Sequence, residues 1–230
     1  MLHIKADEQL FTQAGDVKFG IIHYEGMEAG NIPSMLVGRL QLYIENLHTE
    51  LQTKTWAEYT GIAAWRKIFK QTGADPSRYR PSVEALYRRI KKEPSAPTGN
   101  SAIALNNFFS LQYEIPLGIY DAKAINGDVL IKIGDDADSY EGLNGRRNTL
   151  NGIIGTFDED GPFGSPFVDS VRTSVHDETK EAIQVVYFHH DHSIDQARRM
   201  LEAISKMFLQ VHGGESSIHL LSRENPKIDK

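Results

Sequence analysis

Asp75-Pro-Ser-Arg-Tyr-Arg-Pro-Ser-Val-Glu-Ala-Leu-Tyr-Arg-Arg89 is the most informative stretch of this chain. Pro81 and Ser82 begin a helix there, because a proline in the first turn lacks only an N–H that the helix does not use. Apolar residues then recur at the spacing of one helix face, at Val83, Leu86, Tyr87 and Ile90. The stretch therefore predicts a short amphipathic helix after a proline-framed turn.

The segments on either side of this helix are also predicted to be helical. Leucine and isoleucine residues follow helical spacing after Pro33, at positions 36, 40, 44, 47 and 51. Residues 56–70 and 100–113 form further predicted helices, with Asn100 as a candidate N-cap. Pro116 lies beyond the second of these and cannot continue its hydrogen-bond ladder.

Short apolar segments predict strands, most of them beyond residue 121. We expect these strands at residues 17–24, 128–133, 153–157, 167–173, 182–189 and 217–221. A last helix over 194–211 follows a capping box, in which Ser193 precedes Gln196 by three positions. Helices, then strands, then a helix predict an α+β fold. No long linker interrupts the chain, so we expect a single domain over residues 1–230.

The composition restricts the function classes. The chain has 230 residues, of which 40% are hydrophobic and 24% are charged, as in ordinary globular proteins. It has no cysteine, which excludes structural disulfides, thiolate metal sites and cysteine catalysis. We see neither an apolar signal core nor a membrane span, and we expect a cytoplasmic protein without a membrane partner. The formal net charge of -6 opposes a general nucleic-acid coat, and no DNA partner is expected.

An ordered set of short motifs resembles one known family. The pattern Pro-Ser-x-x-Ala-Leu-x-Arg-Arg occupies residues 81–89, and Trp65 lies ahead of it. The predicted helix that contains Asn107 leads into Pro-x-Gly-x-Tyr-Asp at residues 116–121, and Arg-Thr follows at 172–173. Over residues 65–186, this order resembles the B3/B4 domain of the phenylalanyl-tRNA synthetase β subunit, and especially the free-standing proteins built from that domain.

The resemblance implies a fold and an activity. The fold is α+β, with layered β-sheets packed against helices. In the synthetase, this domain hydrolyses tyrosine that has been mischarged onto the phenylalanine tRNA, and no cofactor is expected. Aminoacylation is not expected, because the synthetase's other domains are missing. The sequence departs from the synthetase pattern at Gly118, where those domains have a histidine, and at residues 164–168 it lacks an aromatic strand motif of many free-standing members.

The basic character of residues 78–92 has two interpretations. Cations outnumber the single carboxylate of Glu84 in this segment. With tRNA or aminoacyl-tRNA as the partner, phosphates would be bound by Arg78, Arg80, Arg88 and Arg89. The alternative is a solvated helix face with a few ion pairs, in which these arginines stabilise the fold. Both interpretations stay open at the level of sequence.

The other candidate residues belong to a pocket and a polar run. The expected pocket residues are Asn107, Gly118 and Tyr120. The expected catalytic residues are Thr173, His176 and Glu178. Ester hydrolysis needs an oriented water and a stabilised oxyanion, and a histidine titrates near the working pH. A plain surface loop is the alternative interpretation of this polar run.

His189-His190-Asp191-His192 contains metal-ligating residue types, but it lies between a predicted strand and the Ser193 cap. A polar connector explains it, and we expect no metal site there. The function hypothesis is binding of tRNA or of an aminoacyl-tRNA 3′ end, with hydrolysis of a mischarged ester. One alternative is a non-catalytic module for a small amino-acid-like ligand. The other is a protein-interaction domain whose basic helix meets an acidic partner.

Overall fold

The structure is a computed structural model that describes residues 3–96 and 99–228, and its α+β architecture agrees with the predicted class. The α-helices are α1 (Glu8–Ala14), α2 (Ser34–Leu51), α3 (Thr60–Thr72), α4 (Ser82–Lys92), α5 (Ser101–Tyr113) and α6 (Ile194–His212). Two 3-10 helices are η1 (Trp56–Glu58) and η2 (Ala122–Ala124).

The strands form two larger sheets and a hairpin. The five-stranded sheet has the order β11-β1-β4-β7-β8, and the four-stranded sheet has the order β10-β2-β9-β3. The strands of the first are β11 (Lys227–Ile228), β1 (Ile4–Ala6), β4 (Val129–Ile133), β7 (Ile154–Asp158) and β8 (Gly161–Gly164). Those of the second are β10 (Glu215–Leu221), β2 (Lys18–Glu25), β9 (Glu181–Phe188) and β3 (Leu117–Asp121). The hairpin pairs β5 (Ser139–Glu141) with β6 (Arg147–Thr149).

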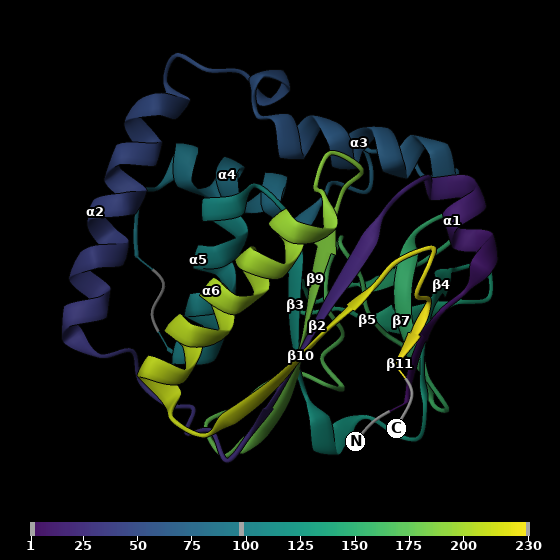
Figure 1. The fold of residues 1–230 in the computed structure, drawn as a ribbon. Helices are drawn as coiled ribbons and strands as arrows, with labels where there is room; N and C mark the ends of the chain where they lie inside the picture. The colour runs from purple at the N-terminus through teal and green to yellow at the C-terminus, as the bar shows by residue number, and fades with distance from the viewer. Residues whose placement is uncertain (1–2, 97–98, 229–230) are drawn as a thin grey trace.

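Both faces of the four-stranded sheet are buried. Along β2, Phe19 and Ile21 belong to a core between the two larger sheets. Ile22 and Tyr24 belong to a different core, because successive side chains of a strand point to opposite faces. Helices α5 and α6 cover that second face, as Figure 1 shows. The four-stranded sheet is therefore the middle layer of the structure.

Helix α4 is the helix predicted from residues 75–89. It packs against α2 and α5 in a third core. Val83, Tyr87 and Ile90 of its predicted apolar face are buried, Leu86 is partly buried, and Glu84 is also buried. The Tyr87 hydroxyl donates to the carbonyl oxygen of Leu111 at 2.9 Å, which joins α4 to α5. The arginines and lysines of α4 therefore project away from the core.

Residues 167–173 do not form the expected strand. The hydroxyl of Ser165 accepts the N–H groups of Phe167 and Val168. The hydroxyl of Ser170 accepts the N–H of Arg172. These bonds give the backbone an alternative to a strand ladder and hold it in turns. Helix α1 and strand β3, in contrast, form where the periodicity predicts no element.

Candidate functional site

Glu84 is a buried carboxylate held by two arginines. Its side chain is 0% exposed. The Arg66 Nη1 donates to Oε2 at 2.8 Å, and the Arg88 Nε donates to Oε1 at 2.9 Å. Removing one partner of such a pair leaves a buried charge poorly compensated, which is strongly destabilising. Arg88, predicted to bind phosphate, therefore has a structural partner within the fold.

The other predicted phosphate-binding arginines are exposed. The guanidinium of Arg78 lies 5.1 Å from the ring centroid of Tyr79, which itself packs on Phe167. Within the described residues, Arg80 and Arg89 make no salt bridge. Their charges are therefore available to an external anion, unlike that of Arg88.

Arg89 and Asn107 line one cavity of about 310 Å³ between α4 and α5. The remaining lining residues are Ser95, Ala96, Asn100, Ile103 and Ala104. Asn100 caps α5 through its Oδ1, as predicted, and its Nδ2 donates to Asp177 Oδ1 at 3.0 Å. The loop that carries His176 and Glu178 therefore lies at the edge of this cavity.

His176 forms a pair with a carboxylate from β3. Its Nε2 lies 3.1 Å from Asp121 Oδ2, which also accepts the Thr179 hydroxyl at 2.7 Å. The N–H of Glu178 points at the ring Nδ1 of His176 at 3.3 Å, which assigns the ring proton to Nε2. The ring is largely exposed, but each of its nitrogens already has a partner in the protein. To act as a base, His176 must give up the Glu178 contact.

Gly118 and Tyr120 do not face the cavity that Asn107 lines. Leu117 and Ile119 point from β3 into the core under α5, whereas Tyr120 points into the core between the sheets. Side chains alternate along a strand, so Gly118 shares the face of Tyr120. Asn107, on α5, lies on the opposite side of the sheet. The structure therefore does not bring the expected pocket residues Asn107, Gly118 and Tyr120 together, because the sheet separates Asn107 from the other two.

Tyr120 belongs to a buried polar cluster. Its hydroxyl donates to Asp169 Oδ1 at 2.7 Å and lies 3.4 Å from the Tyr187 hydroxyl. Burial raises the pKa of Asp169 to about 7, and the hydrogen bond from Tyr120 partly opposes that shift. A Cβ at Gly118 would lie 2.0 Å from the Tyr120 hydroxyl. The Tyr120 ring therefore occupies the space that a histidine at position 118 would need.

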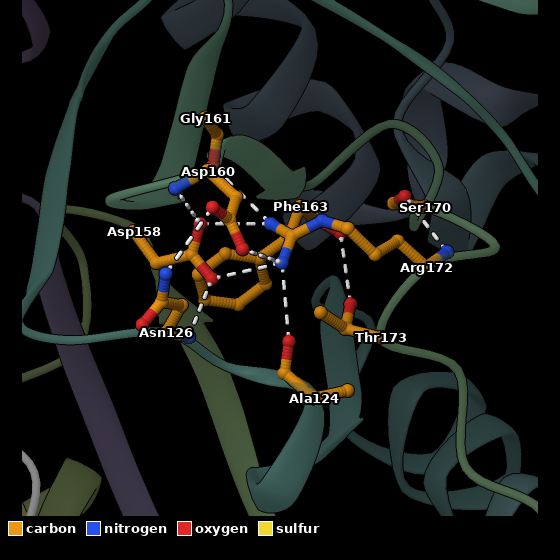
Figure 2. Close-up of polar contacts among 9 residues, drawn as sticks. All are labelled: Ala124, Asn126, Asp158, Asp160, Gly161, Phe163, Ser170, Arg172 and Thr173. Carbon is orange, nitrogen blue, oxygen red and sulfur yellow. Dashed lines mark hydrogen bonds and ion pairs between the residues drawn. The ribbon is translucent and has the colours of Figure 1, made fainter.

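Thr173 is also enclosed, and its neighbour Arg172 holds a second buried carboxylate. The Arg172 guanidinium donates to both carboxylate oxygens of Asp158, at 2.8 and 3.0 Å, and to the carbonyl of Ala124 at 3.1 Å (Figure 2). Thr173 is 0% exposed, and its hydroxyl donates to the carbonyl of Phe163 at 3.5 Å. The Arg-Thr motif thus joins β7, β8 and η2, and Thr173 is enclosed whereas His176 is exposed.

A buried amide network was not predicted from the sequence. Gln184 Nε2 donates to Asn106 Oδ1 at 2.8 Å, and Gln184 Oε1 accepts the Tyr24 hydroxyl at 2.9 Å. Asn106 Nδ2 donates to the carbonyl of Leu117 at 3.3 Å. The signal that could have revealed it is Gln184, a polar residue inside an otherwise apolar strand.

His189 and His192, which follow β9, line a cleft of about 540 Å³ together with Glu114 and Arg199. Burial, more than the neighbouring charges, lowers the pKa of His189 to about 4, so its ring is neutral at pH 7. His189 Nδ1 and His190 Nε2 each lie 3.4 Å from a carboxylate oxygen of Asp191, and these groups could hold a cation. The Asp191 N–H also points at His189 Nδ1, at 3.4 Å, and a cation there would displace it.

Comparisons with known proteins identify the family. The model of the B3/4 domain family matches residues 64–210. The protein YhzB of Bacillus subtilis, described as uncharacterized, is 30% identical over 222 residues, which are 96% of this chain and 100% of that protein. The phenylalanine–tRNA ligase β subunit of Paramagnetospirillum magneticum is 23% identical over 156 residues, which cover 57% of this chain and 20% of that subunit.

A solved structure gives a further match. A crystal structure of an N-terminal fragment of the phenylalanyl-tRNA synthetase β subunit from Pyrococcus horikoshii has a TM-score of 0.47 and 14% identity, and covers 93% of this chain and 49% of that one. Within the described ranges 3–96 and 99–228, no helix combines the length and apolar character needed to cross a bilayer. With the family model matching well over half of its residues, the chain belongs to the B3/4 domain family.

Proposed function

We propose that this protein binds tRNA at its aminoacylated 3′ end. The proposal rests on the cavity that Arg89 and Asn107 line together, beside the basic helix α4. An arginine can bind a phosphate, and an amide can donate to and accept from a ribose or an aminoacyl group. The relationship to a phenylalanine–tRNA ligase β subunit supports tRNA as the class of RNA.

The distribution of charge supports a localised contact. The formal net charge is -6, so the protein as a whole repels a polyanion. The exposed cations Arg78, Arg80 and Arg89 would provide the attraction, and Arg88 would add to it while paired with Glu84. Binding through so few phosphates is moderate in strength and falls steeply with salt.

Hydrolysis of a mischarged aminoacyl ester is the finer part of the proposal. Water would be the nucleophile, and the loop that carries His176 and Glu178 lies at the edge of the cavity, where Asp177 accepts a hydrogen bond from Asn100. His176 would orient or deprotonate the water after releasing the Glu178 N–H. Thr173 would contribute through the fold rather than by contact, since it is buried. No metal or cofactor is part of this proposal.

The test compares tRNA with an intact 3′ end and tRNA that lacks its terminal nucleotide. We expect tighter binding of the intact RNA, and we expect Arg89→Ala/Asn107→Ala to abolish the difference. Arg198→Ala, which removes an exposed arginine from α6, is the control and should leave both affinities unchanged. Equal binding of the two RNAs by the unmodified protein would reject recognition of the 3′ end.

Hydrolysis is tested separately on a panel of mischarged tRNAs. We expect release of the amino acid from at least one member above the spontaneous rate, and slower release by His176→Gln. If no member is hydrolysed faster than in buffer, the enzymatic part is rejected and the binding part stands. Binding of a free amino acid without tRNA would favour the small-ligand module, and binding of an acidic protein alone would favour the interaction domain.

A further inference from the structure

A further cavity lies on the side of α4 that faces away from the Arg89–Asn107 cavity. It has a volume of about 520 Å³ and is lined by η1, α3 and α4. Helix α3 crosses the top of the molecule in Figure 1, with α4 beneath it. The lining residues, which we call the Trp56 groove, are Thr55, Trp56, Ala57, Ala63, Arg66, Lys67, Lys70 and Arg88. Its volume lies within the range of about 300–1,000 Å³ that is typical of small-molecule sites.

The groove concentrates positive charge on an acidic protein. Its charged lining residues are all cations, namely Arg66, Lys67, Lys70 and Arg88. Carboxylates near the groove make ion pairs or hydrogen bonds within the protein. Glu84 is buried and paired with two of these arginines, and Glu58 accepts the N–H and hydroxyl of Thr55 at 2.6 and 2.9 Å. The exposed Asp75 accepts the Ser77 N–H at 2.8 Å. This hydrogen bond lowers the pKa of the Asp75 carboxyl, and the charges of Arg66 and Lys70 lower it further. In the part of the chain that the structure describes, neither Lys67 nor Lys70 forms a salt bridge, so both ammonium groups are available to an external anion.

Trp56 adds an aromatic surface to this charge. The Arg88 guanidinium lies 4.7 Å from its ring centroid, and the Lys91 ammonium lies 5.6 Å from it. The side chain is half-buried, although tryptophan is costly to leave in water. The small apolar side chains of Ala57 and Ala63 line the same groove. An aromatic ring next to cations is the combination that binds unpaired bases and their phosphates.

The position of the groove relates it to the Arg89–Asn107 cavity. Arg88 lines the groove and Arg89 lines the cavity, and neighbouring helix residues project about 100° apart. A single strand that extended from the cavity across α4 would meet the groove. We propose that the Trp56 groove binds one unpaired nucleotide of an RNA strand, with the base stacked on Trp56 and the phosphates bound by Lys67 and Lys70. This inference rests on the RNA binding proposed above and adds a separate contact to it.

Tryptophan fluorescence tests the inference directly. The chain has two tryptophans, and Trp65 is fully buried, so stacking can quench only Trp56. The probe is pentaadenylate RNA, with inorganic polyphosphate as a probe of charge alone. We expect saturable quenching by the RNA in the unmodified protein and none in Trp56→Phe. Polyphosphate should compete for the groove without quenching. Unquenched emission at saturating RNA, or equal quenching in Trp56→Phe, would overturn the inference.

Variants of the lysines separate this inference from the proposed function. Lys67 and Lys70 are exposed, so Lys67→Ala/Lys70→Ala should leave the fold intact. We expect this variant to bind tRNA about tenfold more weakly, with a shallower salt dependence. If the double variant binds tRNA normally while Arg89→Ala/Asn107→Ala does not, the groove is rejected and the proposed function stands. If the unmodified protein binds no tRNA but pentaadenylate still quenches Trp56, the groove stands and the proposed function is rejected.

Discussion

The Tyr120 hydroxyl and the Asp169 carboxylate meet at 2.7 Å in the core between the two larger sheets. Burial raises the pKa of Asp169 to about 7 and also raises that of Tyr120 well above its ordinary value. In the unfolded chain, Asp169 would titrate near 4. The folded state therefore holds this proton over a pH range in which the unfolded state has lost it.

A pH dependence of stability follows from this pair. Because the folded pKa is the higher one, the contribution of Asp169 is fully present below about pH 4 and is lost as the pH rises through about 7. Asp169→Asn mimics the protonated acid and should remove this loss. Denaturant unfolding measures the free energy of unfolding at pH 5 and at pH 8. We expect it to fall between these pH values by a few kcal/mol more in the unmodified protein than in the variant. Parallel drops in the two proteins would contradict the assignment.

Gly118 should be intolerant of a side chain while Tyr120 is present. A Cβ at position 118 would lie 2.0 Å from the Tyr120 hydroxyl and 2.5 Å from the ring carbon that bears it. We expect Gly118→Ala to lower the free energy of unfolding by about 1–3 kcal/mol, the usual range for overpacking. Tyr120→Phe should reduce that penalty in the double variant, because it removes the nearest atom. Additive effects in the double-mutant cycle would show that the two positions do not compete for space.

The adjacent arginines Arg88 and Arg89 provide a matched comparison. Arg88 is paired with the buried Glu84, and Arg89 lines the cavity with no salt bridge in the described residues. We expect Arg88→Ala to lower the free energy of unfolding by about 3 kcal/mol, because Glu84 loses a partner. Arg89→Ala should change it by less than about 0.5 kcal/mol. Chemical denaturation measures both, and equal effects would contradict the division of roles.

Asn106 and Asn107 form a second matched pair on α5. Asn106→Ala leaves the Gln184 amide without its acceptor in the core, so we expect a loss of about 1–3 kcal/mol in unfolding free energy. Asn107 is only partly buried, and Asn107→Ala should be nearly neutral for stability. Thermal unfolding of the two variants decides the point. A larger loss from Asn107→Ala than from Asn106→Ala would contradict the assignment of Asn106 as the structural amide.

Helices α2 to α6 and strands β2, β4, β7, β9 and β10 could be predicted because their local signals agree with their packing. The Ser193–Gln196 capping box is present, and α6 buries Ala197, Leu201 and Phe208 at helical spacing. The strand prediction for residues 167–173 was wrong, because the Ser165 and Ser170 hydroxyls bond to the backbone and hold it in turns. A run of apolar residues does not reveal this competition.

The pocket could not be assembled from sequence because both faces of the middle sheet are apolar. Strand β3 is buried throughout, so the chain gives no sign of which side Gly118 and Tyr120 face. Their neighbours Leu117 and Ile119 have the same hydrophobic character and point to the other side. The pairing of Arg88 with Glu84 is visible as a spacing of four residues, but the burial that makes it structural depends on α3. Residues 78–92 therefore identify the relatives more readily than they separate binding cations from structural ones.

The salt dependence of tRNA affinity measures whether tRNA binds at the Arg89–Asn107 cavity through its phosphates. Affinity should be measured for the unmodified protein and for Arg89→Ala/Asn107→Ala at several salt concentrations, with Arg198→Ala as the control. We expect log Kd to rise linearly with log salt, and we expect the double variant to bind more weakly with a slope smaller by about 1, for one lost phosphate contact. If the affinity of the unmodified protein is independent of salt, or if the double variant keeps its affinity and slope, tRNA is not bound at the Arg89–Asn107 cavity.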